Sequence, residues 1–595
     1  ANINLPGRLV ADGVRVGENV EISEHAQVEG PCLIGSNCRI KSGARIAPYS
    51  VIGNNTLVDE GTLIERSVVM PNSYIGARGK LLACTVGSRV TCRENVEIDE
   101  GAVVGDRCHI DAGAKLRSGV KLWPEKVVEA GSTVTMSLIW GSKWQGSLFR
   151  NLGVGGLANV ELTPEFATKL GACYGSFLPP NSTVVTSRDQ HPVSRMLKRA
   201  LISGLMSVGT KVMDLRNMPL PLTRHSIRSS NAAGGMHVRI APDNPSMALI
   251  EIFDSNGINI STKIERKLEN LFFREDFGRC DIERVGDMEF GSHAILEYSE
   301  AFHNALGSAP ESGRPPKIVI DYAFSRLSTV FTAMLGKLKW DTVSLNAYAD
   351  VTRLIKDEQT ERAVLDNLSR VVVTLNADAG VLMDPEGEKL LVVDNQGRVI
   401  DPNTLTAAFA SLFASQSPNS VVAVPVTAPA AMEDIVEASG GSILRTKTDP
   451  RALMARAEDG DVQLACDCRG GFVCPEFHPS MDAMYAFVKL VHLLQKDGRS
   501  FAELVDSIPR FNLAAQDVPC PWEHKGKIMR VLAQEEGGPN ADYTDGIKII
   551  NGQTWALVLP DSSEPCFHVY AEASNEDTAS ELVRTYTERV RKLAA

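Results

Sequence analysis

The sequence predicts a multi-domain protein that begins with a solenoid of short β-strands and continues as a series of α/β domains. Three observations predict this fold class. The chain has 595 residues, several times what one hydrophobic core can hold. Its first 140 residues carry aliphatic side chains at intervals of six. From about residue 163, segments typical of strands and helices alternate, which predicts mainly parallel sheets in α/β layers.

The interval of six predicts the solenoid. A helix repeats every 3.6 residues and cannot hold a period of six on one face, whereas a coil of three six-residue strands returns each side chain to the same column. Gly17, Gly35 and Gly53 are eighteen residues apart, and we expect them to supply turn geometry. The aliphatic column is formed by Val16, Ile22, Val28, Ile34, Ile40, Ile46, Ile52, Val58 and Ile64.

The repeat is interrupted after Met70 and resumes at Val86, which predicts a loop projecting from the stack. The pattern resembles the left-handed parallel β-helix of hexapeptide-repeat proteins. Some of these are acyltransferases that use a histidine at a trimer interface. His25 and His109 are the only histidines of the repeat, and neither has an evident catalytic setting. The resemblance therefore favours a scaffold that forms homo-oligomers over acyl transfer.

Composition and charge exclude several classes of protein. The net charge of −12 and the pI of about 5.5 argue against nucleic acid and anionic membranes as partners. No run approaches the roughly 20 apolar residues of a membrane span. The twelve cysteines are dispersed without a dense framework, so we expect reduced thiols and a cytoplasmic protein.

The remaining sequence, over about residues 165–595, resembles the α-D-phosphohexomutases, the phosphomannomutase/phosphoglucomutase family. The resemblance implies three similar α/β domains and a smaller α+β domain around one cleft. It also implies phosphate transfer between sugar hydroxyls through a phosphoserine and Mg²⁺, with four loops carrying the chemistry. We place the β-helix at residues 1–140, a linker or cap at 141–162, and domains I to IV at 163–308, 309–415, 416–515 and 516–595.

Loop one of that family reads T-A-S-H-N-P, and its serine carries the phosphate. The matching residues here include Ala241, Pro242, Asp243 and Asn244, so proline stands at the nucleophile position. Proline offers no oxygen to a phosphoryl group. Asp243 could form an acyl-phosphate or could cap a turn.

Loop two reads D-G-D-A-D-R in the family, and its carboxylates hold Mg²⁺. Asp384, Glu386 and Glu388 match those positions. Oxygen ligands suit Mg²⁺, although the longer glutamates would change the ligand geometry. The alternative is an exposed hairpin tip, since D-P-E-G is by itself a good turn.

Loops three and four bind the sugar and its distal phosphate in the family. In loop four, Leu559 replaces an arginine, and Asp561 replaces a serine and would repel phosphate. Cys466, Cys468 and Cys474 lie around loop three, and we expect buried structural thiols rather than a zinc site. The candidate sugar- and phosphate-binding residues are Asp467, Arg469 and Gly470 in loop three, and Ser562, Ser563 and Glu564 in loop four.

A solenoid followed by a phosphohexomutase-like region is similar to long bacterial mannose-1-phosphate guanylyltransferases, which begin with a nucleotidyltransferase domain. The glycine-rich nucleotide loop of that domain is absent here, so we expect either the C-terminal part of such a protein or a relative without its catalytic head. Two functions remain open. One is an assembly or regulatory module whose degenerate mutase region binds a sugar phosphate or nucleotide sugar. The other is an active Mg²⁺-dependent phosphohexomutase with altered site residues.

Overall fold

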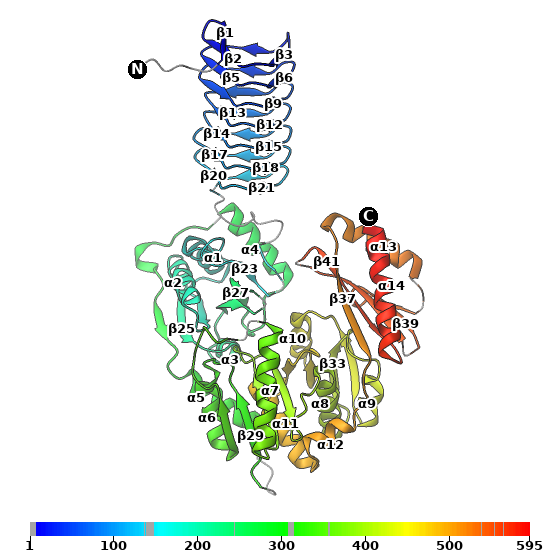
Figure 1. The fold of residues 1–595 in the computed structure, drawn as a ribbon. Helices are drawn as coiled ribbons and strands as arrows, with labels where there is room; N and C mark the ends of the chain where they lie inside the picture. The colour runs from blue at the N-terminus through cyan, green and yellow to red at the C-terminus, as the bar shows by residue number, and fades with distance from the viewer. Residues whose placement is uncertain are drawn as a thin grey trace. The chain divides into compact units, whose positions relative to one another are not determined.

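The computed structural model describes residues 7–135, 137, 148–150, 152–242, 244–275, 277–307, 314–354, 357–536, 538, 540–552, 554–562 and 564–594. The chain divides into two compact units, residues 1–147 and 148–595 (Figure 1). Among the described helices, none combines the length and apolar character needed to cross a bilayer.

The first unit is a solenoid whose coils contribute one strand to each of three sheets. All neighbouring strands are parallel, except that β1 runs antiparallel to β2. The first sheet contains β1 (Arg8–Ala11), β2 (Val14–Val16), β5 (Cys32–Ile34), β8 (Ser50–Ile52), β11 (Val68–Val69), β14 (Thr85–Val86), β17 (Val103–Val104) and β20 (Lys121–Leu122). The second contains β4 (Gln27–Val28), β7 (Arg45–Ile46), β10 (Leu63–Glu65), β13 (Lys80–Leu82), β16 (Glu97–Ile98), β19 (Lys115–Leu116) and β22 (Thr133–Val134). The third contains β3 (Glu21–Ile22), β6 (Arg39–Ile40), β9 (Leu57–Val58), β12 (Tyr74–Ile75), β15 (Thr91–Cys92), β18 (His109–Ile110) and β21 (Val127–Val128).

The sixth-position residues fill the interior of this solenoid, as the sequence predicts. From Ile34 to Ile64 the column is buried, whereas Ile22 in the first coil is exposed. The prediction of a projecting loop after Met70 is wrong. Ile75 and Leu81 are buried core residues, and the coils here pair strands 17 residues apart, such as Tyr74 with Leu57, instead of 18. One residue fewer per coil shifts the sequence period without expelling the chain.

The recurring glycines are explained by close packing between coils rather than by turn geometry. Gly17, Gly35 and Gly53 do not have positive φ. A Cβ on Gly53 would lie 2.5 Å from the backbone nitrogen of Pro71, and one on Gly17 would lie 2.5 Å from that of Ser36. The next coil therefore leaves no room for a side chain. Left-handed turn positions are occupied instead by residues such as Asn37 and Asn55.

Domain I contains a six-stranded mixed sheet in the order β23-β27-β26-β24-β25-β28. Its strands are β23 (Val154–Leu157), β24 (Thr183–Arg188), β25 (Lys211–Asn217), β26 (Gly234–Ala241), β27 (Asn244–Phe253) and β28 (Met288–Phe290). Its helices are α1 (Pro164–Phe177), α2 (Pro192–Met206), α3 (Leu220–Ser229), α4 (Thr262–Arg274) and α5 (Ala294–Leu306), with a 3₁₀ turn at Ile282–Arg284. Strand β23 lies in the segment expected to be a linker, yet it pairs antiparallel with β27 and buries Val154.

Domains II and III each contain a four-stranded sheet with three parallel strands and an antiparallel edge strand. Domain II has β29 (Lys317–Asp321), β30 (Asp341–Leu345), β31 (Ala379–Met383), β32 (Leu390–Asp394), α6 (Leu327–Leu338) and α7 (Glu358–Thr374). Domain III has β33 (Val421–Pro425), β34 (Ser442–Thr446), β35 (Leu464–Cys466), β36 (Phe472–Val473), α8 (Pro402–Gln416), α9 (Met432–Ala438), α10 (Pro450–Glu458), α11 (Ala483–Asp497) and α12 (Phe501–Asp506). Helix α8 begins before the expected boundary at residue 416 because it packs against α9 and α11. A continuous apolar core joins domains I, II and III.

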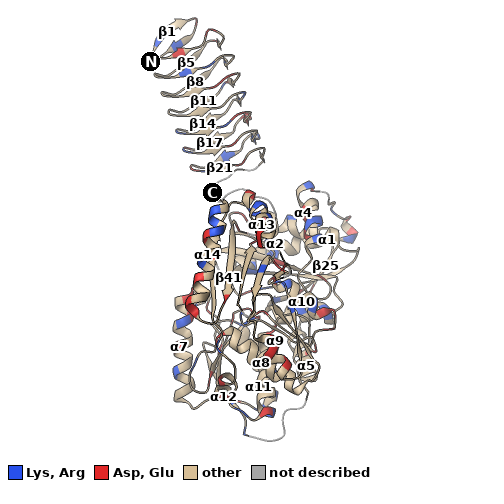
Figure 2. Ribbon diagram, turned by 90° about the vertical axis from the view of Figure 1, so that its right-hand side faces the viewer, with Lys and Arg blue, Asp and Glu red and all other residues tan. Residues whose placement is uncertain are grey.

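Domain IV is an antiparallel sheet in the order β37-β41-β40-β39-β38, covered by two helices. Its elements are β37 (Leu513–Pro519), β38 (Ala541–Asp542), β39 (Ile547–Asn551), β40 (Thr554–Pro560), β41 (Cys566–Glu572), α13 (Trp522–Glu536) and α14 (Glu576–Ala594). Strand β37 starts before the expected boundary at residue 516 because it pairs with β41 over its whole length. Figure 2 shows that α14, like α7, carries charges of both signs along its length.

Candidate functional site

Loop one is the tip of the hairpin between β26 and β27. Ala241 pairs with Asn244 across the tip, and the Asn244 side chain accepts a hydrogen bond from the Ser246 backbone at 3.0 Å. Pro242 is exposed and lines a cavity of about 240 Å³. Asp243 lies outside the described residues. The hairpin therefore presents the proline, which has no reactive oxygen, toward the cavity.

The cavity at Pro242 lies between domain I and domain II. Polar side chains from both domains line it, including Asp189 and His191 of domain I and Ser325 of domain II. Asp189 is held in place because it accepts backbone hydrogen bonds from Ile240 and His191, each at 2.8 Å. Such a mixture of apolar walls and a few fixed polar groups is typical of small-molecule sites.

Loop two is packed against domain I, so the expectation of an exposed hairpin tip is wrong. Glu386 and Gly387 are buried, and Asp384 and Glu388 are largely covered. The Leu220 backbone nitrogen donates to the Glu386 carbonyl at 3.1 Å, which fastens α3 of domain I to this loop. Tertiary packing rather than the turn chemistry of D-P-E-G determines its environment.

Two arginines of domain I neutralise the buried carboxylates. Arg224 Nη2 lies 3.1 Å from Glu388 Oε1, and Arg239 Nη2 lies 2.7 Å from Glu251 Oε1. The longer pairs, Arg224 with Glu251 at 3.8 Å and Arg239 with Glu388 at 3.9 Å, close a four-membered network. Two cations and two anions balance each other in this interior, as buried charges require.

Glu386 faces His237, and the pair is neutral near pH 7. Burial raises the pKa of Glu386 to about 8 and lowers the pKa of His237 to about 4. Their Oε2 and Nε2 atoms are 3.2 Å apart. The other ring nitrogen of His237 lies 2.7 Å from the Ser187 hydroxyl. Burial likewise raises the pKa of Asp384 to about 6.

The residues of loop two do not fit a divalent cation. Mg²⁺ needs ionised oxygens converging at about 2.1 Å in octahedral geometry. Here Glu388 points to Arg224, Glu386 Oε2 lies 3.2 Å from His237 Nε2, and Asp384 accepts a hydrogen bond from the Lys389 backbone nitrogen at 2.7 Å. Within the described ranges, the one cluster of three His, Cys, Asp or Glu ligand atoms close enough to share an ion lies elsewhere, at Asp561, Cys566 and His568.

Loop three contacts loop two. Leu390 donates its backbone hydrogen to the Gly470 carbonyl at 3.0 Å, and Lys389 lies 3.7 Å from the buried carboxylate of Asp467. Arg469 reaches domain IV, where it donates to the Tyr570 hydroxyl at 3.1 Å. The three cysteines around this loop are buried free thiols, as expected: Cys466, Cys468 and Cys474.

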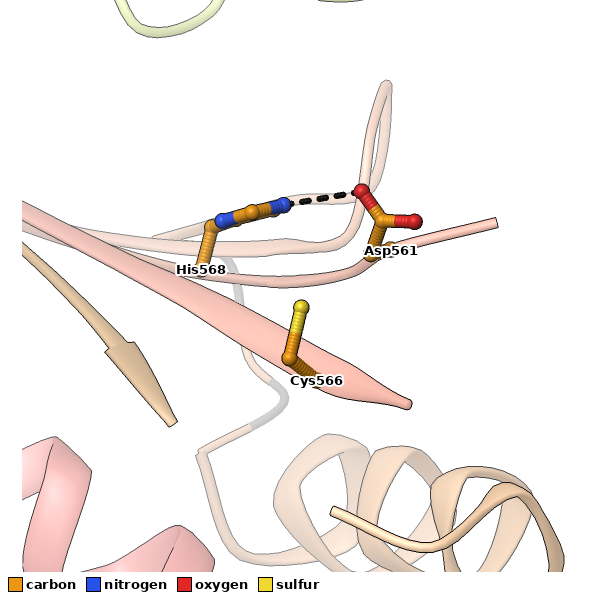
Figure 3. A group of neighbouring side chains, drawn as sticks. All are labelled: Asp561, Cys566 and His568. Atoms are coloured by element: carbon orange, nitrogen blue, oxygen red, sulfur yellow. Dashed lines mark hydrogen bonds and ion pairs between the residues drawn. The ribbon is translucent and has the colours of Figure 1, made fainter. Parts of the chain in front are cut away.

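Loop four is held by contacts within domain IV. Lys525 donates to the carbonyls of Asp561, at 2.7 Å, and of Glu564. His568 lies between two carboxylates, 2.9 Å from Asp561 (Figure 3) and 2.6 Å from Asp517. Burial opposes the charged imidazole, but these two hydrogen bonds raise the pKa of His568. Both ring nitrogens of His568 are engaged by carboxylates, and Asp561 itself carries negative charge, so these side chains do not favour a phosphate.

The structure brings loops one, two and three together but keeps loop four apart from the cavity at Pro242. Of the candidate residues, Asp384 and Glu386 line this cavity with Ala241 and Pro242, whereas Ser562 and Glu564 do not. Ser563 lies outside the described residues. Sequence reasoning missed His237 and Arg239, although their spacing of two on a predicted strand puts both side chains on one face.

Family models match three parts of the chain. Residues 146–279 match the phosphoglucomutase/phosphomannomutase alpha/beta/alpha domain I, and residues 401–511 match domain III of the same family. Residues 28–137 match the GMPPB C-terminal domain.

Curated relatives match most of the chain after the solenoid. The phosphoglucomutase/phosphomannomutase of Thermococcus kodakarensis is 29% identical over 441 residues, covering 73% of this chain and 96% of that protein. The probable phosphoglucosamine mutase of Pyrococcus furiosus is 28% identical over 444 residues, covering 74% and 96%.

Solved structures show the same fold at low identity. A phosphoglucomutase/phosphomannomutase family protein from Burkholderia thailandensis superposes with a TM-score of 0.66 at 19% identity, covering 76% of this chain and 98% of that one. A putative phosphomannomutase from Thermus thermophilus gives 0.60 at 19% identity, covering 74% and 98%. The chain thus joins a phosphohexomutase-like α/β fold to a repetitive parallel-strand region similar to the GMPPB C-terminal domain.

Proposed function

We propose that this chain is the non-transferring part of a sugar-nucleotide pyrophosphorylase of the mannose-1-phosphate guanylyltransferase type. Its phosphohexomutase-like region binds a sugar phosphate or a nucleotide sugar without moving the phosphate. Its β-helix assembles the chain into homo-oligomers and connects this region to a nucleotidyltransferase domain. The similarity to the GMPPB C-terminal domain supports the link to that class of enzyme.

One observation carries the proposal: the groups that phosphoryl transfer needs are absent or already engaged. Pro242 stands at the nucleophile position, and arginines occupy the surroundings of the acidic loop. A guanidinium ion-paired with Glu388 competes with any metal ion for the same oxygens. The cavity nevertheless keeps polar groups such as Asp189 and His191, which suit sugar hydroxyls.

The second candidate is an active phosphohexomutase with altered site residues. The names of the curated relatives favour it, since they include phosphoglucomutase/phosphomannomutase and phosphosugar mutases that align over nearly their whole length. In that case Asp243 would carry the phosphate as an acyl-phosphate.

A turnover assay separates the two candidates. The chain is incubated with glucose-1,6-bisphosphate, mannose-1-phosphate and Mg²⁺, and ³¹P NMR follows mannose-6-phosphate. We expect no turnover and no hydroxylamine-labile phosphoprotein. Magnesium-dependent turnover that disappears in Asp243→Ala would instead establish the second candidate.

A binding assay tests the positive part of the proposal. A ligand that binds only the folded state at 100 times its Kd raises the unfolding free energy by about 2.7 kcal/mol. Mannose-1-phosphate or a nucleotide sugar should therefore raise the thermal midpoint without Mg²⁺, while mannose should not. No shift with any phosphorylated sugar would contradict ligand binding, and a monomeric mass in light scattering would contradict the assembly role.

A further inference from the structure

Two further cavities lie beside the cavity at Pro242, and cationic side chains line both. One has a volume of about 650 Å³, and the other about 640 Å³. Both are lined by Arg188, Arg195 and Arg216. The first adds Arg326 from domain II, and the second adds Lys198 and Arg199. This concentration of positive charge contrasts with the net charge of −12 for the whole chain.

The fold holds these arginines in place from four elements. Arg188 ends β24, Arg195 lies on α2, and Arg326 immediately precedes α6. Arg216 in β25 has a φ of 63°, a left-handed conformation that non-glycine residues rarely adopt. Its guanidinium stacks 4.2 Å from the ring centroid of Phe290. Backbone strain at a residue that a neighbouring ring holds in position is typical of functional sites.

These guanidinium groups lack carboxylate partners. The two acids that line the cavities are engaged with other cations: Asp214 with Lys198, and Asp350 with Arg353 at 3.6 Å. Arg188 is 9% exposed, and its side chain donates to the neutral carbonyl of Asp189 at 2.5 Å. Across the part of the chain that the structure describes, no carboxylate lies within ion-pair distance of the four guanidinium groups at Arg188, Arg195, Arg216 and Arg326.

Like charges gather in this arginine cluster. Burial and the neighbouring charges of Arg195 and Arg326 lower the pKa of Arg188, whereas the carboxylates of Asp189 and Asp214 act in the opposite direction. A bound polyanion would relieve this repulsion and supply oxygens for the forked guanidinium donors. Because the positive groups come from both domain I and domain II, the anion would also bridge the two domains.

The first cavity is continuous with the one at Pro242. They share Gln190, Asn217, Met218, Arg326 and Val351 among their lining residues. The Pro242 cavity has apolar walls that include Ile240 and Leu354, together with a few polar groups. An anion held by the arginines can therefore extend an uncharged organic part into the neighbouring space.

We propose that Arg188, Arg195, Arg216 and Arg326 bind the diphosphate group of an organic ligand, a nucleoside diphosphate or its sugar ester. Two linked phosphates carry more charge and more oxygens than one, and four guanidinium groups drawn from two domains match that larger anion. The inference deepens the proposed function, since it specifies the chemical group that is bound and the residues that bind it.

Isothermal titration of the full chain at physiological salt tests the site. The probes are inorganic pyrophosphate, inorganic phosphate, and ADP, GDP and UDP in parallel, all without Mg²⁺. We expect pyrophosphate and at least one nucleoside diphosphate to bind about tenfold or more tightly than phosphate. The double variant Arg195→Gln/Arg326→Gln should weaken this binding about tenfold or more, because charge-assisted hydrogen bonds are lost. Both side chains are exposed, so the variant should fold.

The matched control is Arg266→Gln, which removes an exposed arginine of α4 that lines neither cavity. It should bind the probes like the parent chain. Because Arg195→Gln removes repulsion, that single variant should melt no lower than the parent without ligand, and its melting temperature should rise less with pyrophosphate. Equal affinity for phosphate and pyrophosphate, or full affinity in the double variant, would overturn the inference. Mutase turnover would contradict the proposed function but leave this binding result intact.

Discussion

Replacing Glu386 by glutamine should change how stability depends on pH. In the parent chain the buried carboxyl of Glu386 keeps its proton up to about pH 8, because burial raises its pKa from 4.5. In the unfolded chain the same group ionises near its ordinary value. Between these two values the folded state therefore binds one proton more than the unfolded state.

The sign and size follow from that difference. A raised folded-state pKa gives stability that is fully present below pH 4.5 and is lost as the pH rises toward 8. One proton changes the unfolding free energy by about 1.4 kcal/mol per pH unit. From pH 6 to pH 8 the parent should lose about 2 kcal/mol relative to Glu386→Gln, which has no proton to release, because the carboxyl is already half ionised at pH 8. The glutamine keeps the size and the polarity of the side chain.

Urea unfolding at several pH values, followed through the transition of the unit formed by residues 148–595, measures the difference in unfolding free energy between the parent and Glu386→Gln. Infrared difference spectroscopy provides a direct check, since the parent should lose a carboxylic-acid carbonyl band near pH 8 that the variant lacks. Glu297→Gln, at an exposed position on α5, is the control and should follow the parent. Parallel pH profiles for parent and Glu386→Gln, or loss of the acid band below pH 6, would refute the reasoning.

Three further predictions concern single positions. Gly53→Ala should lower the stability of the solenoid by about 1–3 kcal/mol in thermal unfolding, because its Cβ would meet the next coil, while Gly278→Ala in open space should change little. Arg239→Met should cost about 3–5 kcal/mol in urea unfolding, since it leaves one cation for two buried carboxylates; an unchanged midpoint would argue against the network. Pro242→Ser returns a hydroxyl to loop one but should give no mutase turnover, since the acidic loop stays engaged by arginines; measurable mannose-6-phosphate would contradict this.

Local sequence determined the solenoid and the positions of the loops. A period of six residues fits a three-sided coil and does not fit an α-helix. The sequence therefore predicts that the column from Ile34 to Ile64 is buried, and the structure confirms it. The prediction of a projecting loop after Met70 was wrong because the coil there is one residue shorter. The shorter coil keeps its strand pairing, but it interrupts the six-residue period of the sequence. The hairpin tip at Pro242 was located by its motif, and its missing oxygen is a property of the residue itself.

Only the tertiary structure decided what surrounds each loop. Arg224 and Glu388 form an ion pair although they are 164 residues apart in the sequence. The local sequence D-P-E-G does not predict that domain I buries this loop. The first arginine cavity likewise combines arginines of domain I with Arg326 of domain II. The sequence around each of these arginines does not distinguish it from an arginine on an ordinary surface. Charged groups interact through space, and the strength of each interaction depends on how deeply the groups are buried. The ion pairs, pKa values and repulsions of these side chains are therefore determined only when segments distant in the sequence pack together.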